Sequence, residues 1–140
     1  MVEQDTKYTI FKINNEFYGI DVNSVNNIIQ FPTITNVPGA PNHYRGIINL
    51  RGEIVPVMSL KSKLGSGVDT LTQDSRIIIL NVEEDKLLGI TVDEVKEVLP
   101  ISSSEIEKPS PFINSNESIV KGIGKHGDDL ISIISANSIL

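Results

Sequence analysis

The stretch that decides the fold reads NVPGAPNHYRGIINLRGEIVPVMSLKSKLG, residues 36–65. It contains two apolar runs, GIINL and EIVPVMSL, which only Arg51 and Gly52 separate. Two β-prone runs joined by a two-residue turn with glycine are typical of a β-hairpin. Pro56 lies inside the second run and cannot donate a ladder hydrogen bond, so this strand is expected at a sheet edge or with a bulge. The stretch therefore predicts a strand, a tight turn and a second strand, followed by a helical turn that ends near Gly65.

The flanking segments contain further signals of secondary structure. KYTIFKINNEFYGIDV (7–22) reads as a hairpin with an Asn-Asn turn, and SRIIILNVEEDKLLGITV (75–92) as a strand, an acidic turn and a strand. In VNSVNNIIQ (22–30) the apolar residues follow helical spacing, which predicts a helix of at most two turns. A proline near the start of APNHYR (40–45) predicts another brief helix. The Ser-, Pro- and Asn-rich residues 101–118 predict a long loop.

Two segments of the chain recur. GIDVNSVNNII (19–29) and GITVDEVKEVL (89–99) share the pattern G-I-x-V-x-x-V-x-x-[IV]-[IL]. RGIINLRGEIVPV (45–57) returns more weakly as KGIGKHGDDLISI (121–133). Two copies are too few, and their spacing is too long, for a solenoid array. We therefore infer two similar small β-units that pack together.

Length and composition suit one folded domain, since the chain has 140 residues of which 39% are hydrophobic. Each half holds about five short strands, and closing them into a barrel removes the exposed edges of a small sheet. The expected fold class is mostly β: two small five-stranded antiparallel barrels around a shared hydrophobic core, with a few short helices. The first barrel is expected from about residues 15–70 plus the C-terminal segment, and the second from about residues 71–135.

The net charge of −6 is unevenly distributed along the chain. Residues 1–70 carry six basic and six acidic residues, whereas residues 71–140 carry six basic and twelve acidic ones. A nucleic-acid protein needs a basic face to neutralise phosphates, so no nucleic-acid partner is expected. The absence of cysteine excludes disulfides and thiolate metal sites. No apolar run approaches the ~20 residues of a membrane span and no secretory signal is present, so a cytoplasmic location without membrane insertion is expected.

Residues that could perform chemistry are few. His43 and His126 lie in different halves, and neither has the spacing of a zinc helix. The acidic clusters at 83–85 and 128–129 fall at expected hairpin turns, which is typical of solvated charge. The sequence therefore predicts no catalytic residue, no metal and no cofactor. One alternative stays open, a β-barrel ligand-binding or enzyme domain whose site is built from loops.

Three segments together resemble the CheW-like family of bacterial chemotaxis adaptors: VPGAP…YRGIINLRGEIVPVMSLKSKLG, FYGIDVNSVNNII and LLGITVDEVKEVL. The resemblance covers residues 7–140 and rests above all on the N-L-R-G motif. It implies a scaffold rather than an enzyme, one that couples the cytoplasmic tip of a chemoreceptor to the regulatory domain of the histidine kinase CheA. It also implies a monomer when isolated, recruited in the cytoplasm to receptor arrays at the membrane.

The resemblance implies two sets of contact residues. Receptor contacts fall on Val25, Asn27, Ile28, Gly46, Arg51 and Val98, and kinase contacts on Phe31, Ile34, Thr35, Pro38, Lys108 and Phe112. A groove between the two barrels would accept one receptor helix through its apolar side chains.

Several of these residues have a structural interpretation beside the functional one. Val25 and Ile28 suit either core packing or receptor contact. Arg51 either pairs with a receptor carboxylate or caps carbonyls of its own hairpin. Gly46 is expected to serve backbone geometry. Asn27 stands where relatives can carry an acidic residue.

Overall fold

The computed structural model describes residues 6–108 and 119–139. The elements are, in chain order, β1 (Thr6–Ile13), β2 (Glu16–Asp21), η1 (Val22–Ser24), β3 (Val25–Ile29), β4 (Tyr44–Leu50), β5 (Glu53–Ser59), α1 (Leu60–Lys63), β6 (Arg76–Val82), η2 (Glu83–Asp85), β7 (Lys86–Val92), β8 (Glu94–Ile101), η3 (Ser103–Glu105), β9 (Ile106–Glu107), β10 (Val120–His126), β11 (Asp129–Ile134) and η4 (Ala136–Ile139), where η marks a short 3₁₀ turn. Helix α1 is the helical turn predicted before Gly65.

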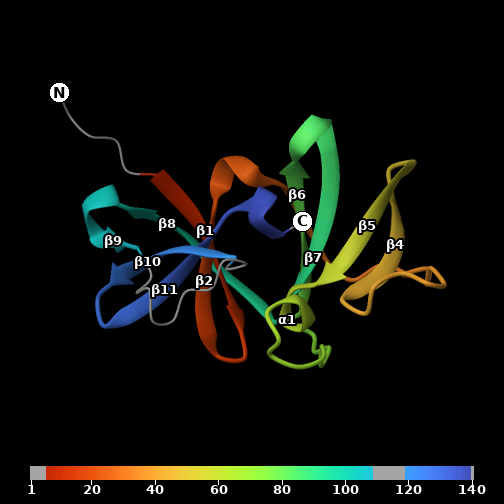
Figure 1. Cartoon of the computed structure of the whole chain (residues 1–140), viewed down its shortest axis with the longest axis horizontal. Coiled ribbons are helices and arrows are strands. Elements are labelled where there is room, and N and C mark those ends of the chain that lie inside the picture. Colours follow the sequence, from red (N-terminus) through yellow and green to blue (C-terminus); the bar gives the residue numbers. More distant parts are fainter. Residues whose placement is uncertain (1–5, 109–118, 140) are drawn as a thin grey trace.

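The strands form two sheets, which lie beside each other in Figure 1. Sheet A has the strand order β8-β1-β2-β11-β10-β9, and sheet B has the order β3-β6-β7-β5-β4. The predicted fold class, a mostly β chain built as two small units around a shared core, is confirmed. Neighbouring strands are antiparallel except in two pairs, β2 with β11 and β5 with β7, which the sequence analysis did not anticipate.

Apolar side chains gather in one cluster inside each sheet and in a third cluster shared between the sheets. Strand β6 contributes to two of them, because Ile77 and Ile79 point into the cluster of sheet B while Ile78 and Leu80 point into the shared cluster. A strand buried on both faces reads as a continuous apolar run, which explains the sequence RIIIL. The shared cluster contains Phe11, Ile13, Tyr18, Ile20, Met58, Leu60, Ile78, Leu80, Leu88, Ile90, Val92, Ile119, Ile134, Ala136 and Ile139.

The chain crosses between the sheets twice. After β2, turn η1 leads into β3, which joins sheet B beside β6; after β7, strand β8 joins sheet A beside β1. The predicted barrel segments of about 15–70 and 71–135 therefore each contribute strands to both sheets. The sheets do not follow those boundaries because local patterns indicate strands but do not encode which distant strand each one pairs with.

Two predicted short helices are wrong. Residues 22–30 form turn η1 and strand β3 rather than a two-turn helix. Their apolar spacing imitates a helix because a three-residue turn precedes a strand whose register shifts between Val25 and Asn27. Residues 40–45 form a turn in which the Tyr44 N–H donates to the Pro41 carbonyl at 2.9 Å, and β4 begins at Tyr44.

The predicted hairpin turns are confirmed by their backbone angles. The two asparagines between β1 and β2 have φ of 53° and 65°, and Arg51 and Gly52 have φ of 54° and 86°. Pro56 faces Ile47 of β4, whereas the parallel pairing of β5 with β7 begins only at Val57. The expectation of an edge or bulged strand is wrong, because β5 lies between β7 and β4 and the extra residue of the register shift is on β4; proline instead occupies the part of β5 beyond the β7 ladder, where its missing N–H is tolerated.

The sequence repeat is also a structural repeat. Gly19 of β2 faces Ile133 of β11 in parallel, and Gly89 of β7 faces Val57 of β5 in the same way. A Cβ added at Gly19 would lie 3.2 Å from the nearest side-chain carbons, and one at Gly89 would lie 3.0 Å from a methyl of Ile77. The two glycines therefore occupy equivalent crowded positions inside the two sheets.

The two later hairpins repeat an irregularity as well. In β4–β5 the register shifts between Tyr44 and Gly46, and in β10–β11 it shifts between Val120 and Gly122. The extra residue is Arg45 in the first hairpin and Lys121 in the second. An inserted residue bends its strand and re-aims its side chain, so these bulges mark equivalent corners of the two halves.

Candidate protein-docking surfaces

The tip of the β4–β5 hairpin presents Arg51 to solvent. The turn is closed from within, because the Gly52 N–H donates to Asn49 Oδ1 at 2.8 Å. Among the residues that the structure describes, none forms a hydrogen bond or ion pair with the Arg51 guanidinium. The alternative in which Arg51 caps its own hairpin is therefore not observed, and its planar fork remains available to a carboxylate of another molecule.

Gly46 serves backbone geometry, as predicted. Its φ is +140°, and an added Cβ would lie 2.1 Å from the Thr35 carbonyl oxygen. Thr35 and Ile47 exchange two backbone hydrogen bonds, each 2.9 Å long, directly beside this glycine. Gly46 thus allows the segment between β3 and β4 to lie against β4 and does not itself present a side chain to a partner.

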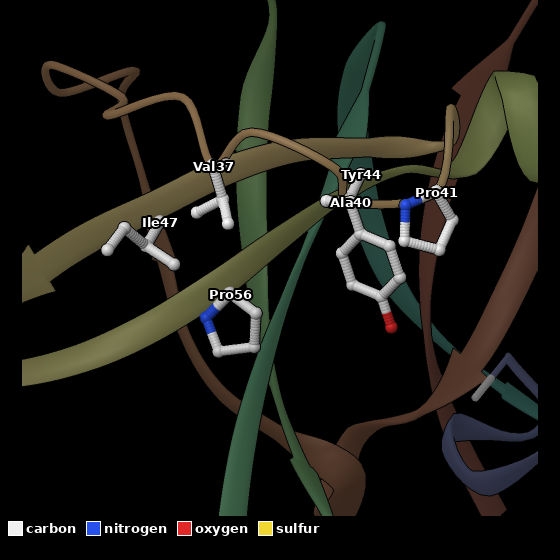
Figure 2. A pocket seen from close by; sticks show the side chains of 7 residues that line it. Val37, Ala40, Pro41, Tyr44, Ile47 and Pro56 are labelled. Carbon is white, nitrogen blue, oxygen red and sulfur yellow. The ribbon is translucent and has the colours of Figure 1, made fainter.

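That segment and the outer face of the hairpin enclose an apolar pocket of about 250 Å³. Figure 2 shows Val37, Ala40 and Pro41 of the segment opposite Ile47 and Pro56 of the strands, with the Tyr44 ring at one side. Ile54 lies two residues before Pro56 on the same face of β5 and is 70% exposed. Exposed branched side chains beside an apolar hollow are typical of a protein-docking surface.

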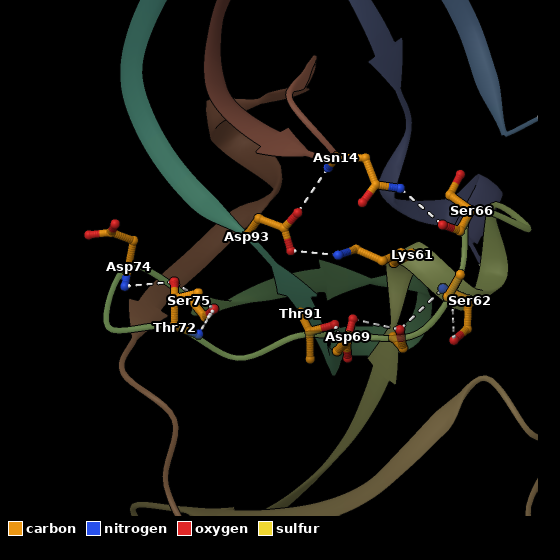
Figure 3. Close-up of polar contacts among 12 residues, drawn as sticks. Asn14, Lys61, Ser62, Ser66, Asp69, Thr72, Asp74, Ser75, Thr91 and Asp93 are labelled. Carbon is orange, nitrogen blue, oxygen red and sulfur yellow. Dashed lines mark hydrogen bonds and ion pairs between the residues drawn. The ribbon is translucent and has the colours of Figure 1, made fainter.

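A buried carboxylate, that of Asp69, joins three strands of sheet B. Asp69 accepts hydrogen bonds from Arg45 Nη1, Ser59 Oγ and Thr91 Oγ1, each 2.9 Å long, and its side chain is only 6% exposed. Figure 3 shows Asp69 beside Thr91, where the segment after α1 crosses the strand ends. Since the three donors come from β4, β5 and β7, Asp69 ties the β4 bulge to the rest of sheet B.

A second polar network joins the two sheets. The largely buried Lys61 Nζ lies 3.1 Å from Asp93 Oδ1, and Asp93 Oδ2 accepts the Asn14 N–H at 2.9 Å. The Asn14 side chain in turn donates to the Ser66 carbonyl at 2.9 Å (Figure 3). This network, here called the inter-sheet clasp, links the β1–β2 turn, the region of α1 and the crossover from β7 to β8.

The predicted kinase-contact residues are divided between the interior and the surface. Phe31 and Ile34 are partly buried and pack against the cluster of sheet B, whereas Thr35 and Pro38 are exposed. Lys108 is exposed directly after β9. Phe112 lies outside the described residues. Thr35 pairs with the pocket residue Ile47 and Pro38 follows the pocket residue Val37, whereas Phe31 lines a separate hollow with Gln30 and Leu71.

The predicted receptor-contact residues of the repeated segments lie on two edge strands. Val25, Asn27 and Ile28 belong to β3 at the edge of sheet B, and Val98 belongs to β8 at the edge of sheet A. Ile28 and Val98 occupy equivalent positions of the repeat, with exposures of 38% and 49%. Val25 packs against the shared cluster and therefore has the structural role that was left open for it.

Sequence reasoning missed the pocket side chains and both polar networks. The pocket depends on contacts between residues 37–41 and strands that follow later in the chain, and only the Pro- and Ala-rich composition of that segment hinted at an apolar surface. Asp69, Lys61 and Asp93 had no signal of their own, because their partners come from distant strands.

Two kinds of feature were sought and not found within residues 6–108 and 119–139. No three His, Cys, Asp or Glu side chains gather closely enough to hold a metal ion. In the same residues, no helix has both the length and the apolar character needed to cross a bilayer.

Comparisons with known proteins find similar sequences and a similar fold. A match to the family described as "CheW-like domain" covers residues 7–140. The chemotaxis protein CheW of Bacillus subtilis is 32% identical over 140 residues, covering 99% of this chain and 89% of that protein. The chemotaxis protein CheW of Helicobacter pylori is 29% identical over 138 residues, covering 99% and 83%.

A solved structure agrees with these matches. The crystal structure of the scaffolding protein TtCheW from Thermoanaerobacter tengcongensis superposes with a TM-score of 0.89 at 38% identity, covering 96% of this chain and 92% of that one. The matched proteins are named as chemotaxis and scaffolding proteins, which are not enzymes. Because the family match covers residues 7–140, the chain belongs to the CheW-like domain family of chemotaxis scaffold proteins.

Proposed function

We propose that this chain is an adaptor that couples the cytoplasmic tip of a chemoreceptor to the regulatory domain of the histidine kinase CheA. The observation that carries the proposal is the β4–β5 hairpin, which has at its tip an arginine with no partner among the described residues and on its outer face an apolar pocket. These two features suit two different partners, one polar and one apolar. An adaptor needs such separate surfaces, because it must hold both partners at once.

Receptor contact is proposed for Arg51 and for the exposed positions Ile28 and Val98 of the edge strands. A receptor tip is a helical coiled coil, polar outside with an apolar stripe. Exposed apolar side chains would cover that stripe, and the guanidinium of Arg51 would pair with a carboxylate or with carbonyls at a helix end. Asn27 is half-buried on β3, and its Oδ1 accepts the N–H of Ile28 at 2.9 Å, so it would contribute little charge to this contact.

Kinase contact is proposed for the apolar pocket and for the segment 31–38, which contributes Val37 to the pocket lining. Val37 and Ile54 are exposed beside the pocket and would supply the apolar area that an interface core requires. Lys108 and Phe112 are proposed for a second kinase contact on the other half. Such contacts would recruit the chain from the cytoplasm to receptor arrays at the membrane. The alternative of a loop-built enzyme or ligand site is not favoured, because the described pocket lining offers the Tyr44 hydroxyl but no convergent set of polar side chains.

Co-sedimentation with the kinase and with receptor-tip fragments tests this proposal. The chain should pellet with clustered receptor fragments, bind the kinase regulatory domain, and raise kinase autophosphorylation only when receptor and kinase are both present. Failure to bind either partner at micromolar concentrations would contradict the adaptor role.

The Arg51→Ala variant separates the two surfaces. It should weaken receptor binding by about 2 kcal/mol, roughly thirtyfold, while binding of the kinase regulatory domain stays within about twofold of wild type. Lys86→Ala is the matched control, because Lys86 is an exposed cation at the η2 hairpin and forms an exposed ion pair with Glu84. Receptor binding at wild-type strength by Arg51→Ala would remove Arg51 from its proposed role.

A further inference from the structure

The two sheets differ at one pair of equivalent corners, and the difference points to a binding site. In sheet B the bulge residue Arg45, the strand-end residue Ser59 and Thr91 converge on Asp69. The segment after α1 carries Asp69 into this corner. This corner therefore binds one carboxylate, and the chain itself supplies that carboxylate as Asp69.

Sheet A contains the equivalent corner. Lys121 is the bulge residue of β10, as Arg45 is of β4. Ser135 follows β11 and precedes η4, as Ser59 ends β5 and precedes α1. Asp21 follows Ile20, the partner of Ile134, and so stands opposite Ser135.

In this second corner the described residues leave a hollow of about 260 Å³ instead of a filled network. It is lined by Thr6, Tyr8, Asp21, Ser24, Lys121, Ile133, Ile134 and Ser135, so all three counterparts of the Asp69 partners face it. Lys121 is exposed and forms no ion pair with any residue in 6–108 or 119–139. The cation and the hydroxyl that hold Asp69 in sheet B thus have counterparts at this hollow, and within the described residues Lys121 has no carboxylate at ion-pair distance.

One difference between the two corners limits which ligands can bind. Where the first corner has Thr91, which donates a hydrogen bond to Asp69, the second corner has Asp21, whose carboxylate can only accept hydrogen bonds at neutral pH. A simple anion would be repelled by Asp21, whereas a peptide offers a carboxylate for Lys121 and Ser135 and also a backbone N–H for Asp21. The Tyr8 phenol, which is neutral at pH 7, also lines the hollow and can donate a hydrogen bond there.

We propose that this hollow binds an aspartate side chain on a peptide segment of a partner protein, with Lys121 and Ser135 holding the carboxylate and Asp21 accepting a backbone N–H. The site is separate from the hairpin tip and the apolar pocket, and it does not depend on the adaptor role. The corner of sheet B supplies the precedent for this ligand, because there the carboxylate of Asp69 also arrives on a peptide segment rather than as a free ion.

The test uses the intact chain labelled with ¹⁵N and a probe peptide, acetyl-SGVDTLT-amide, which reproduces residues 66–72 around Asp69. Amide shifts are followed at about 0.15 M salt, so that the negative net charge of the chain is screened. The peptide should cause saturable shifts at Thr6, Asp21, Lys121 and Ser135, with a dissociation constant on the order of millimolar. The control peptide acetyl-SGVNTLT-amide and sodium acetate should each bind about tenfold more weakly.

Two variants test the assigned residues. Lys121→Met and Ser135→Ala should each weaken peptide binding, by about tenfold and about fivefold. Lys125→Met is the matched control, because Lys125 lies on the same strand in an exposed ion pair with Glu107; its affinity should stay within about twofold of wild type.

Three outcomes would overturn the proposal: absence of saturable shifts in the hollow, unchanged affinity in Lys121→Met, or equal affinity for acetate and the aspartate peptide. The last result would reduce the site to a non-specific cation contact. None of these outcomes bears on receptor or kinase binding, which the co-sedimentation experiment tests separately.

Discussion

The β4–β5 and β10–β11 hairpins follow one plan but present different surfaces. Each has a bulge followed by a glycine, and at each glycine another segment of the chain lies against the strand. For Gly46 that segment contains Thr35, and for Gly122 it is strand β9, with Ile106 and Glu107. The packing requirement is therefore shared by the two halves.

The outer faces differ. Beside the first hairpin, Val37, Tyr44 and Pro56 help to enclose an apolar pocket, whereas the positions of Tyr44 and Pro56 are taken by Val120 and Ser132 in the second hairpin. The acidic surplus of the chain also lies in its second half. Duplication thus kept the parts that close each sheet and changed the side chains that face outward, which allows one small fold to present unlike surfaces to unlike partners.

The largest expected effect compares the two glycines. Gly46→Ala should cost about 4 kcal/mol of unfolding free energy, because its Cβ would meet the Thr35 carbonyl oxygen and its φ of +140° is strained for alanine. Gly122→Ala should cost about 2 kcal/mol, because its Cβ would meet the Ile106 Cγ2 methyl at 2.6 Å, and a side chain yields more readily than backbone.

Urea denaturation of both variants beside wild type measures this difference. If Gly46→Ala is too unstable for a full transition, the fraction folded without denaturant gives a lower limit on its loss. Equal losses of unfolding free energy in the two variants would show that a contact with backbone at Gly46 costs no more than a contact with a side chain at Gly122, and would contradict this prediction.

The inter-sheet clasp offers a second comparison, because the repeat positions of Lys61 and Asp93 are occupied by Asn137 and Asn23. Asp93→Ala should cost about 2 kcal/mol, since it leaves the Lys61 ammonium largely buried without its partner; the partial exposure of Asp93 limits the loss. Lys61→Met should cost less than about 1 kcal/mol, because an apolar chain of similar length replaces the cation and packs against the same surroundings.

Asn23→Ala is the matched control in the other half and should change stability by less than about 0.5 kcal/mol. Thermal and urea unfolding of the three variants provide the measurement. A larger loss for Lys61→Met than for Asp93→Ala would contradict the view that an unpaired buried charge, rather than a missing attraction, dominates the effect.

The sequence was sufficient to predict features that depend on neighbouring residues. The Asn-Asn turn, the Arg51-Gly52 turn and the repeat around Gly19 and Gly89 all follow from local patterns with a direct backbone cause. The helix predicted for residues 22–30 is wrong because an apolar spacing of three and four residues arises equally from a 3₁₀ turn followed by a bulged strand. Short apolar runs cannot be assigned by periodicity alone.

The candidate site was less predictable than the fold. Arg51 was found through its motif, but the apolar pocket forms only when residues 37–41 fold back onto β4 and β5, and the Asp69 network depends on the parallel pairing of β5 with β7. No local pattern encodes these pairings. The sequence repeat relates Arg45, Ser59 and Thr91 to Lys121, Ser135 and Asp21. It therefore predicts the corner in sheet A, but only once the corner around Asp69 in sheet B is known.

The smallest expected effect concerns alkaline stability and again separates the halves. Tyr8 and Tyr18 lie in sheet A, where the equivalent positions of sheet B carry the apolar Ile78 and Leu88. Burial raises the pKa of both phenols above the ordinary value of 10.0; the nearby charges of Asp21, for Tyr8, and Glu16, for Tyr18, raise each pKa further. A raised folded-state pKa leaves stability unchanged below pH 10 and lowers it as the pH rises from there through the folded-state pKa, because the unfolded chain ionises first.

Tyr18→Phe and Tyr8→Phe should therefore each flatten the loss of stability above pH 10, by less than about 1 kcal/mol. Urea midpoints between pH 8 and about 11.5 measure the slope, with Tyr44→Phe as control because Tyr44 belongs to sheet B. A wild-type stability that does not fall above pH 10, or a Tyr44→Phe variant that flattens it as much, would place the alkaline sensitivity outside sheet A. The two sheets would then not differ in the pH dependence of their stability. They would still be equivalent in packing, since the matched glycines and bulges do not depend on either phenol.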